Sequence, residues 1–371
     1  MLELRVMSTG APFTSIEAIV EPYSGANEKQ QFYCRTSIAR YCLREGIPFR
    51  ETGSHFPNQL RFLRRARESS RVQKLLPWGV GTKAIDSIAG LLGADPKKPE
   101  DGAGSYLFHR GSLDVKVCID GNDSGVVTRP DLLEWSDLYF KTNFWPERVY
   151  PPKVVPLAHV SSGAFRVQPL LKELRNAPKE LDLFASFGVR GGVDEIEGVE
   201  HGLGLVEALA RAKCKKKVLA LLIAGDISAA ARRLDKAGVP WTTKWMPQKE
   251  LWDYAAKSRL NIVRHGMHQC MAFRMSEILA IGGCPVLDYA PRTRWHVPLE
   301  ENIHYLNLQA TYRPGEAAFD AKEVADRVEC WLASPDLAKG ISQNAARYFD
   351  EHLTLEVFGG YIVQEVSRAA G

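Results

Sequence analysis

Basic and acidic side chains gather within residues 263–289, where strand-like and helix-like patterns alternate. Arg264 and His265 follow an apolar run of strand length, and they precede a segment with helical spacing of apolar residues. Arg274 and Glu277 are three residues apart, so they are neighbours on one face of that helix. In open α/β sheets, ligands bind at strand carboxyl ends and helix amino ends. The pattern predicts a site for an anionic ligand here.

A second group of chemically useful residues follows the strand-like run 113–119. Asp120 and Asp123 come directly after it, where carboxylates can act as a general base or bind substrate hydroxyls. Two other interpretations stay open: the Asp-Gly-Asn-Asp stretch is also a common local turn, and carboxylate oxygens also bind divalent metals. The spacing differs from an Asp-x-Asp metal motif, so metal binding is the weakest of the three interpretations.

Arg190 and Gly191 follow a third strand-like run, residues 181–188. Glycine lets backbone amides approach a phosphate, and an arginine adds positive charge beside it. The P-loop pattern is absent, so this loop is not that of a P-loop nucleotide hydrolase.

The elements around these residues predict an α/β protein with two domains. The second half alternates strands and helices, including the continuous apolar run 218–225 that is typical of a strand covered on both faces. Prolines interrupt residues 146–156, which therefore form neither helix nor central strand and lead into an interdomain linker. Three helical stretches close the chain, at about 321–333, 336–348 and 354–369.

The segment around Glu277 resembles the donor-binding element of glycosyltransferases with two Rossmann-like domains, the GT-B fold. The resemblance rests on a loop, a helix with an acidic residue, and the stretch Ala-Ile-Gly-Gly-Cys-Pro-Val at 280–286. It implies that Glu277 bonds the ribose of a nucleotide sugar and that Arg274, in an Arg-x-x-Glu pattern, and other basic residues hold the diphosphate. The second upstream glutamate of the more familiar branch is absent here.

The same resemblance implies a base-contacting loop at Met246, before a helix in which Leu251, Tyr254 and Ala255 match the family pattern. It implies two Rossmann-like domains facing across a cleft, with C-terminal helices crossing back to the first domain. We expect an acceptor domain at 1–155, a donor domain at 156–352 and a returning helix at 353–371.

Bulk composition restricts the class of protein and its partners. The net charge of +4 over 371 residues is mild, which argues against a dedicated nucleic-acid binder. No apolar run reaches the roughly 18 residues of a membrane span, and the first thirty residues lack a secretory pattern. The seven cysteines form no Cys-x-x-Cys pair. We expect a cytoplasmic protein, for which the basic stretch 58–76 offers either a solvated helix face or a peripheral contact with an anionic inner-membrane face.

These observations favour a glycosyltransferase that moves a sugar from a nucleotide sugar to a hydroxyl of a carbohydrate or lipid-linked acceptor, in cell-surface polysaccharide or glycolipid synthesis. The donor would be held by Arg190, Gly191, Met246, Arg264, His265, Arg274 and Glu277, with Lys244 as a weaker candidate. Asp120 or Asp123 would be the base, with His109 and His159 as alternatives. No cofactor and no metal are implied. An epimerase-like nucleotide-sugar enzyme and a two-domain binding protein stay as alternatives.

Overall fold

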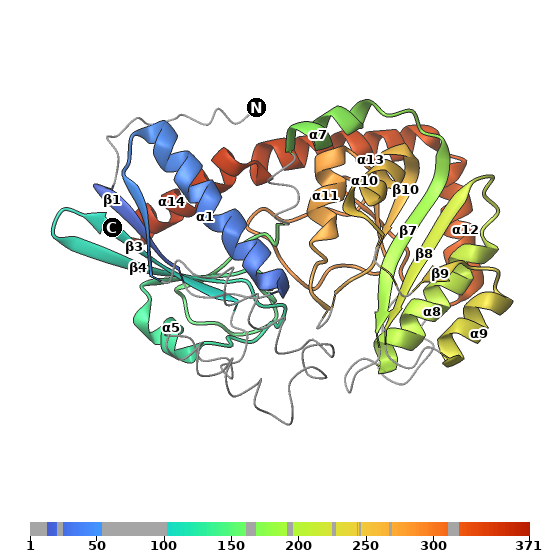
Figure 1. The fold of residues 1–371 in the computed structure, drawn as a ribbon, viewed down its shortest axis with the longest axis horizontal. Helices are drawn as coiled ribbons and strands as arrows, with labels where there is room; N and C mark the ends of the chain where they lie inside the picture. The colour runs from blue at the N-terminus through green and yellow to red at the C-terminus, as the bar shows by residue number, and fades with distance from the viewer. Residues whose placement is uncertain are drawn as a thin grey trace, which may run out of the picture.

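The computed structural model describes residues 13–20, 25–53, 102–160, 168–190, 196–224, 228–310 (apart from 243, 245, 267 and 268) and 319–371. These residues form two α/β lobes, each built on a six-stranded sheet (Figure 1). The basic stretch 58–76, for which we considered membrane contact, lies outside the described residues.

The first lobe holds β1 (Ser15–Val20), β2 (Phe49–Gly53), β3 (Ala103–Arg110), β4 (Leu113–Asp120), β5 (Leu138–Lys141) and β6 (Val154–Pro156). The strand order is β2-β1-β3-β4-β5-β6. β3 runs antiparallel to both of its neighbours, whereas the other pairings are parallel. This sheet is therefore a Rossmann-like parallel sheet with one antiparallel strand inserted at its centre.

Local sequence signals set the ends of the elements in this lobe. Helix α1 (Gly25–Glu45) ends at Gly46, whose φ of 71° is the left-handed conformation that glycine adopts at a helix C-terminus. The apolar run 135–145 contains one strand, β5, which is shorter than the run. The short helix α5 (Pro130–Trp135) begins with a proline at its first turn, and β5 ends at Lys141.

The second lobe contains the strands β7 (Leu181–Arg190), β8 (Lys217–Ala224), β9 (Trp241–Thr242), β10 (Ser258–Val263), β11 (Pro285–Leu287) and β12 (Leu306–Asn307). All of their pairings are parallel, in the order β12-β11-β10-β7-β8-β9. The chain starts in the middle of this sheet and reverses direction between β7 and β10. That pair is the topological switch point, the place where α/β sheets bind ligands.

Helices cover both faces of the second sheet. They are α8 (Ile196–Arg211), α9 (Ser228–Lys236), α10 (Gln248–Lys257), α11 (Arg274–Ile281), α12 (Ala321–Leu332) and α13 (Pro335–Tyr348). The helix α7 (Gln168–Glu173), the 3-10 turn η1 (Leu174–Asn176) and the π-helical turn η3 (Phe349–Leu353) complete the lobe. The C-terminal helices lie within one or two residues of their predicted positions. No helix in the described part of the chain has the length and apolar character of a membrane span.

The last helix, α14 (Leu355–Ala369), leaves the second lobe and packs along α1 of the first lobe (Figure 1). The rings of Tyr33 and Phe358 meet edge to face at 5.5 Å, and the Tyr33 hydroxyl donates to the carbonyl of Leu353. This crossing confirms the predicted return of the C-terminal helix. The domain boundaries that we placed at 155 and 352 stay predictions.

Glycine makes the close approach of α14 to α1 possible. A Cβ at Gly359 would lie 2.1 Å from the carbonyl oxygen of Ser37, whereas a Cβ at Gly340, within α13, would meet nothing within 4 Å. We expect Gly359→Ala to lower the free energy of unfolding by about 1–3 kcal/mol, because α14 must move away from α1. We expect Gly340→Ala to raise it by up to about 1 kcal/mol, because alanine favours the helix.

Urea denaturation of the two variants beside the wild type measures both effects. Equal stability of the two variants would show that α14 does not depend on this contact.

Candidate donor and acceptor sites

The predicted diphosphate-binding arginines lie together at the switch point of the second sheet. Arg264 Nη1 donates to the carbonyl of Gly188 at 3.1 Å, and Arg274 Nη1 donates to the carbonyl of Ser186. Both acceptors belong to the carboxyl-terminal half of β7, and Arg264 follows β10 directly. Burial lowers the pKa of the Arg274 guanidinium, which nevertheless stays charged. Two cations therefore border the place where β7 and β10 end.

Glu277 occupies the first turn of α11 and is 3% exposed. Its carboxylate accepts a hydrogen bond from Gln248 Nε2 at 3.0 Å, and Gln248 begins α10. A carboxylate in the first turn of a helix is stabilised by the helix dipole. Met246 lies just before α10 and packs against the main hydrophobic core. These positions place Glu277 and the predicted base-contacting loop on adjacent helices.

The remaining predicted donor residues are described only in part. The backbone of Arg190 ends β7, next to the switch point, but its side chain lies outside the described part of the structure. Gly191 also lies outside the described residues. Lys244 is exposed, and its backbone amide donates to Thr242 Oγ1 at 3.0 Å. The switch point thus joins Arg264 and Arg274 with the backbone of Arg190.

His265 is buried and belongs to a compact network at the carboxyl ends of β10 and β11. Its Nδ1 lies 2.5 Å from Asp288 Oδ1, and His201 Nε2 lies 3.2 Å from Asp288 Oδ2. The ring of Tyr289 stacks on His265 with centroids 4.0 Å apart. Burial raises the pKa of Asp288, but the two imidazoles together lower it well below its usual range. Asp288 is therefore an anion shared by two histidines.

The two predicted catalytic carboxylates have different environments. Asp120 is fully buried and forms an ion pair of 3.0 Å with Lys141, which is also fully buried. Its carboxylate further accepts from the Tyr139 hydroxyl at 2.8 Å and from the backbone and side-chain amides of Asn122 at 2.9 and 2.8 Å. A carboxylate with four donors is held as a structural anion, so the geometry does not support Asp120 as the base.

Asp123 lies at the seam between the two lobes and is half-buried. Burial, the charge of Asp123 and a hydrogen bond to its carboxylate raise the pKa of the Cys270 thiol, which belongs to the second lobe. His159 is 5% exposed, and burial lowers its pKa despite the nearby charge of Asp123. The His159 ring meets Phe273 edge to face at 6.1 Å. Asp123 is thus the predicted carboxylate that faces the donor lobe.

Asn143 connects the loop of Asp123 to the second lobe, and the sequence analysis did not single it out. It is 2% exposed. Its amide donates to the carbonyl of Asp123, and its oxygen accepts from Thr293 Oγ1 and, at 3.1 Å, from Trp145 Nε1. Arg292 lies over the Trp145 ring at 3.7 Å. The only sequence signal was a polar residue near the end of the strand-like run 135–145.

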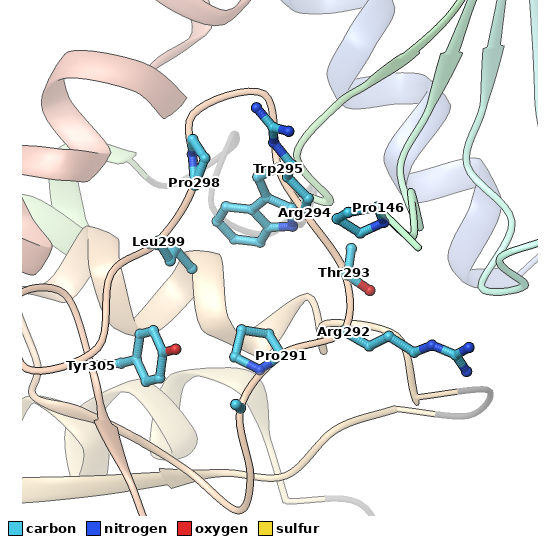
Figure 2. A pocket seen from close by; sticks show the side chains of 10 residues that line it. Pro146, Pro291, Arg292, Thr293, Arg294, Trp295, Pro298, Leu299 and Tyr305 are labelled. Carbon is cyan, nitrogen blue, oxygen red and sulfur yellow. The ribbon is translucent and has the colours of Figure 1, made fainter. Parts of the chain in front are cut away.

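The segment 290–299 forms the second-lobe side of this seam. The backbone amide of Arg294 donates to Phe144 at 2.9 Å, and Arg292 pairs with Glu147. Figure 2 shows a pocket of about 200 Å³ that this segment forms with Pro146. Its wall is largely apolar, and the guanidinium groups of Arg292 and Arg294 point away from the Trp295 ring (Figure 2). The seam is therefore a packed contact between loops that leave the carboxyl ends of β5 and β11.

His109, another alternative for the base, lies away from this seam. It is on β3, where its ring pairs with Asp114 at 2.6 Å and lies 3.8 Å from Glu17. The described residues contain no group of three or more histidine, cysteine or acidic side chains arranged to hold a metal ion.

Comparison with known proteins finds one family model and several solved structures. Residues 205–357 match a family model described as glycosyl transferase-like. The search of curated proteins gives no match. Anabaena HepE, solved with UDP and glucose, aligns over 94% of this chain and 98% of its own at 11% identity and a TM-score of 0.47. A Rickettsia africae glycosyltransferase aligns over 95% and 97% at 11% identity and a TM-score of 0.42.

Residues 205–357 are thus similar to glycosyl transferase-like proteins, and the chain as a whole has two Rossmann-like lobes. The match spans the segment from α8 to the start of α14, which includes Glu277 and both arginines of the switch point. The two lobes and the returning helix α14 confirm the predicted fold, and the match over residues 205–357 agrees with the predicted enzyme class. The roles of individual site residues stay predictions.

The buried pair of Asp120 and Lys141 generates a test of their structural role. We expect Asp120→Asn to lower the free energy of unfolding by about 3–5 kcal/mol, because it leaves the Lys141 ammonium buried without a counter-charge. The double variant Asp120→Asn, Lys141→Met removes that charge and should recover part of the loss, as urea denaturation would measure. A single variant that keeps its stability but loses activity would restore Asp120 as a catalytic candidate.

Proposed function

We propose that this chain transfers a sugar from a nucleotide sugar to a hydroxyl acceptor, with the donor bound at the carboxyl ends of β7 and β10. The observation that carries the proposal is the convergence of Arg264 and Arg274 on β7 at the switch point, with Glu277 at the start of α11. Charges placed where a leaving diphosphate develops negative charge are the electrostatic stabilisation that such a transfer needs.

In this proposal each side chain has a distinct role. Arg264 and Arg274 stabilise the diphosphate, together with Arg190 and the backbone of Gly191. Glu277 accepts hydrogen bonds from the ribose, as its near-complete burial in the first turn of α11 favours. Met246 contacts the nucleotide base from the loop before α10.

The acceptor hydroxyl would approach from the first lobe, where Asp123 is the base. The charge of Asp123 acts on Cys270, which belongs to the loop before α11, and this supports an approach of the acceptor toward the donor side. A base that takes the acceptor proton on the side opposite the leaving group would give inversion at the sugar carbon. No cofactor takes part in this proposal, and the charge of the leaving group is neutralised by arginines rather than by a metal.

The acceptor that we propose is a carbohydrate or lipid-linked molecule of cell-surface polysaccharide or glycolipid synthesis. WaaG, a structurally similar glycosyltransferase involved in lipopolysaccharide biosynthesis, suggests lipopolysaccharide precursors as the first acceptors to assay. We also propose a cytoplasmic location for the chain, as its reduced, scattered cysteines favour.

Binding of the donor can be tested by thermal shift against UDP, GDP, ADP and TDP and their common nucleotide sugars. A ligand at 100 times its dissociation constant adds about 2.7 kcal/mol of stability, which raises the midpoint clearly. We expect nucleotides of one nucleobase to raise the melting midpoint of the wild type. The Glu277→Ala variant should not show this rise. Glu323→Ala, which removes an exposed acid in the first turn of α12, should keep it. Absence of a response to every nucleotide would refute the donor site.

The role of Asp123 can be tested by steady-state kinetics with the nucleotide sugar that binds. We expect Asp123→Asn to lower kcat by about 10²- to 10⁴-fold, the range of general-base catalysis, and to leave donor affinity unchanged. Asp131→Asn, which changes an exposed acid of α5 in the same lobe, is the matched control and should keep full activity. If Asp123→Asn stays active, Asp123 is not the base and His159 becomes the candidate.

A further inference from the structure

In the network of His201, Asp288 and His265, one buried carboxylate contacts two imidazole rings. Asp288 is fully buried and ionised, so its oxygens can only accept hydrogen bonds. Its Oδ1 also lies 3.3 Å from the backbone amide of His265 and 3.2 Å from that of Tyr289. The two imidazole nitrogens that face the carboxylate must therefore carry protons, which fixes His265 with a proton on Nδ1.

The other ring nitrogen of His265 is left without a partner. In the described residues, Nε2 is buried and makes no hydrogen bond. A ring whose single proton is on Nδ1 has a lone pair on Nε2, which can accept a hydrogen bond. A buried acceptor without a donor is costly, and such exceptions mark places where a ligand completes the bonding.

The position of His265 indicates which part of a donor would reach it. His265 follows Arg264, the residue that lies beside the end of β7, so it is adjacent to the proposed diphosphate site. The Asp288 carboxylate, 2.5 Å from the ring, disfavours a second anion at Nε2. A hydroxyl group suits this environment, because it donates to the lone pair and carries no charge.

We propose that His265 accepts a hydrogen bond from a hydroxyl of the transferred sugar, and that Asp288 and His201 are positioning residues that hold it in the required tautomer. This inference rests on the proposed function and adds a determinant of sugar specificity to it. The Tyr289 ring stacks on one face of the imidazole and limits its rotation. A ligand is therefore recognised through the Nε2 edge of the ring.

Two substitutions of His265 distinguish the roles of its two ring nitrogens. His265→Asn keeps an amide that can donate to Asp288 and removes Nε2, whereas His265→Gln extends a polar group toward the position of Nε2. His304→Asn is the control for loss of a histidine elsewhere, because its ring lies against Tyr348 at 4.9 Å, in another part of the lobe.

The experiment is isothermal titration of the nucleotide sugar and nucleoside diphosphate selected by the thermal-shift panel, with UDP-glucose and UDP as the pair if uridine is the base. We expect His265→Asn to weaken binding of the nucleotide sugar on the order of tenfold, and binding of the nucleoside diphosphate by less than about twofold. His265→Gln should recover part of the affinity, and His304→Asn should match the wild type.

Deoxy analogues of the donor sugar identify the hydroxyl. One analogue should bind the wild type on the order of tenfold more weakly than the parent, and His265→Asn should no longer distinguish the two. Asp288→Asn should lose the same discrimination, because its amide can donate to Nδ1 and so allow the opposite tautomer. A merely structural role for Asp288 would not change the ratio of parent to analogue.

Other outcomes would overturn the inference. If His265→Asn binds the nucleotide sugar and the nucleoside diphosphate equally more weakly, His265 contacts the phosphates. If its affinity for both is unchanged, His265 does not contact the donor. These results leave the donor site intact. Failure of the wild type to bind any nucleotide sugar would instead refute the proposed function and this contact together.

Discussion

The structure depends on one constraint: loops from the carboxyl ends of two separate sheets must meet in a fixed register. The buried side-chain amide of Asn143 fixes this register through two hydrogen bonds. It donates to the carbonyl of Asp123 in its own lobe and accepts from the hydroxyl of Thr293 in the other. A buried amide placed in this way is specific, because displacement of either lobe would leave a polar group without a partner. Packing of α14 against α1 holds the lobes together at a second place, far along the chain. Two separate contacts restrict rotation of the lobes more strongly than either one does.

This register also connects the two halves of the proposed site. The chain from Asp288 runs through Tyr289 into the segment 290–299, whose Thr293 reaches Asn143. The carboxylate that orients His265 is thus five residues from the hydroxyl that helps to hold the Asp123 loop. Any ligand that orders the end of β11 therefore acts on a segment that is continuous with the acceptor side.

Much of the second lobe could be predicted because its local signals agree with its tertiary structure. Apolar runs of strand length alternate with amphipathic helices, and the glycines after α11 end it, with Gly282 at a φ of 64°. The two carboxylates after β4 could not be separated in the same way. Asp120 is neutralised by Lys141 because β4 and β5 pair with these residues opposite each other, and that register is a long-range property. Asn143 and Thr293 are 150 positions apart, so no local pattern indicates their contact. The antiparallel β3 likewise depends on pairing rather than on composition.

The distribution of acidic groups explains how an anionic donor can approach a site that contains so many carboxylates. Asp120 is balanced by Lys141, Asp288 is shared by two imidazoles, and Glu277 accepts from Gln248. These three acids therefore each have an internal hydrogen-bond donor that weakens the negative charge they present to a ligand. Arg264 and Arg274 instead bond to uncharged backbone carbonyls of β7, which orient their guanidinium groups without cancelling their charge. Two guanidinium groups therefore lie beside the carboxyl ends of β7 and β10, where positive charge attracts an anionic ligand.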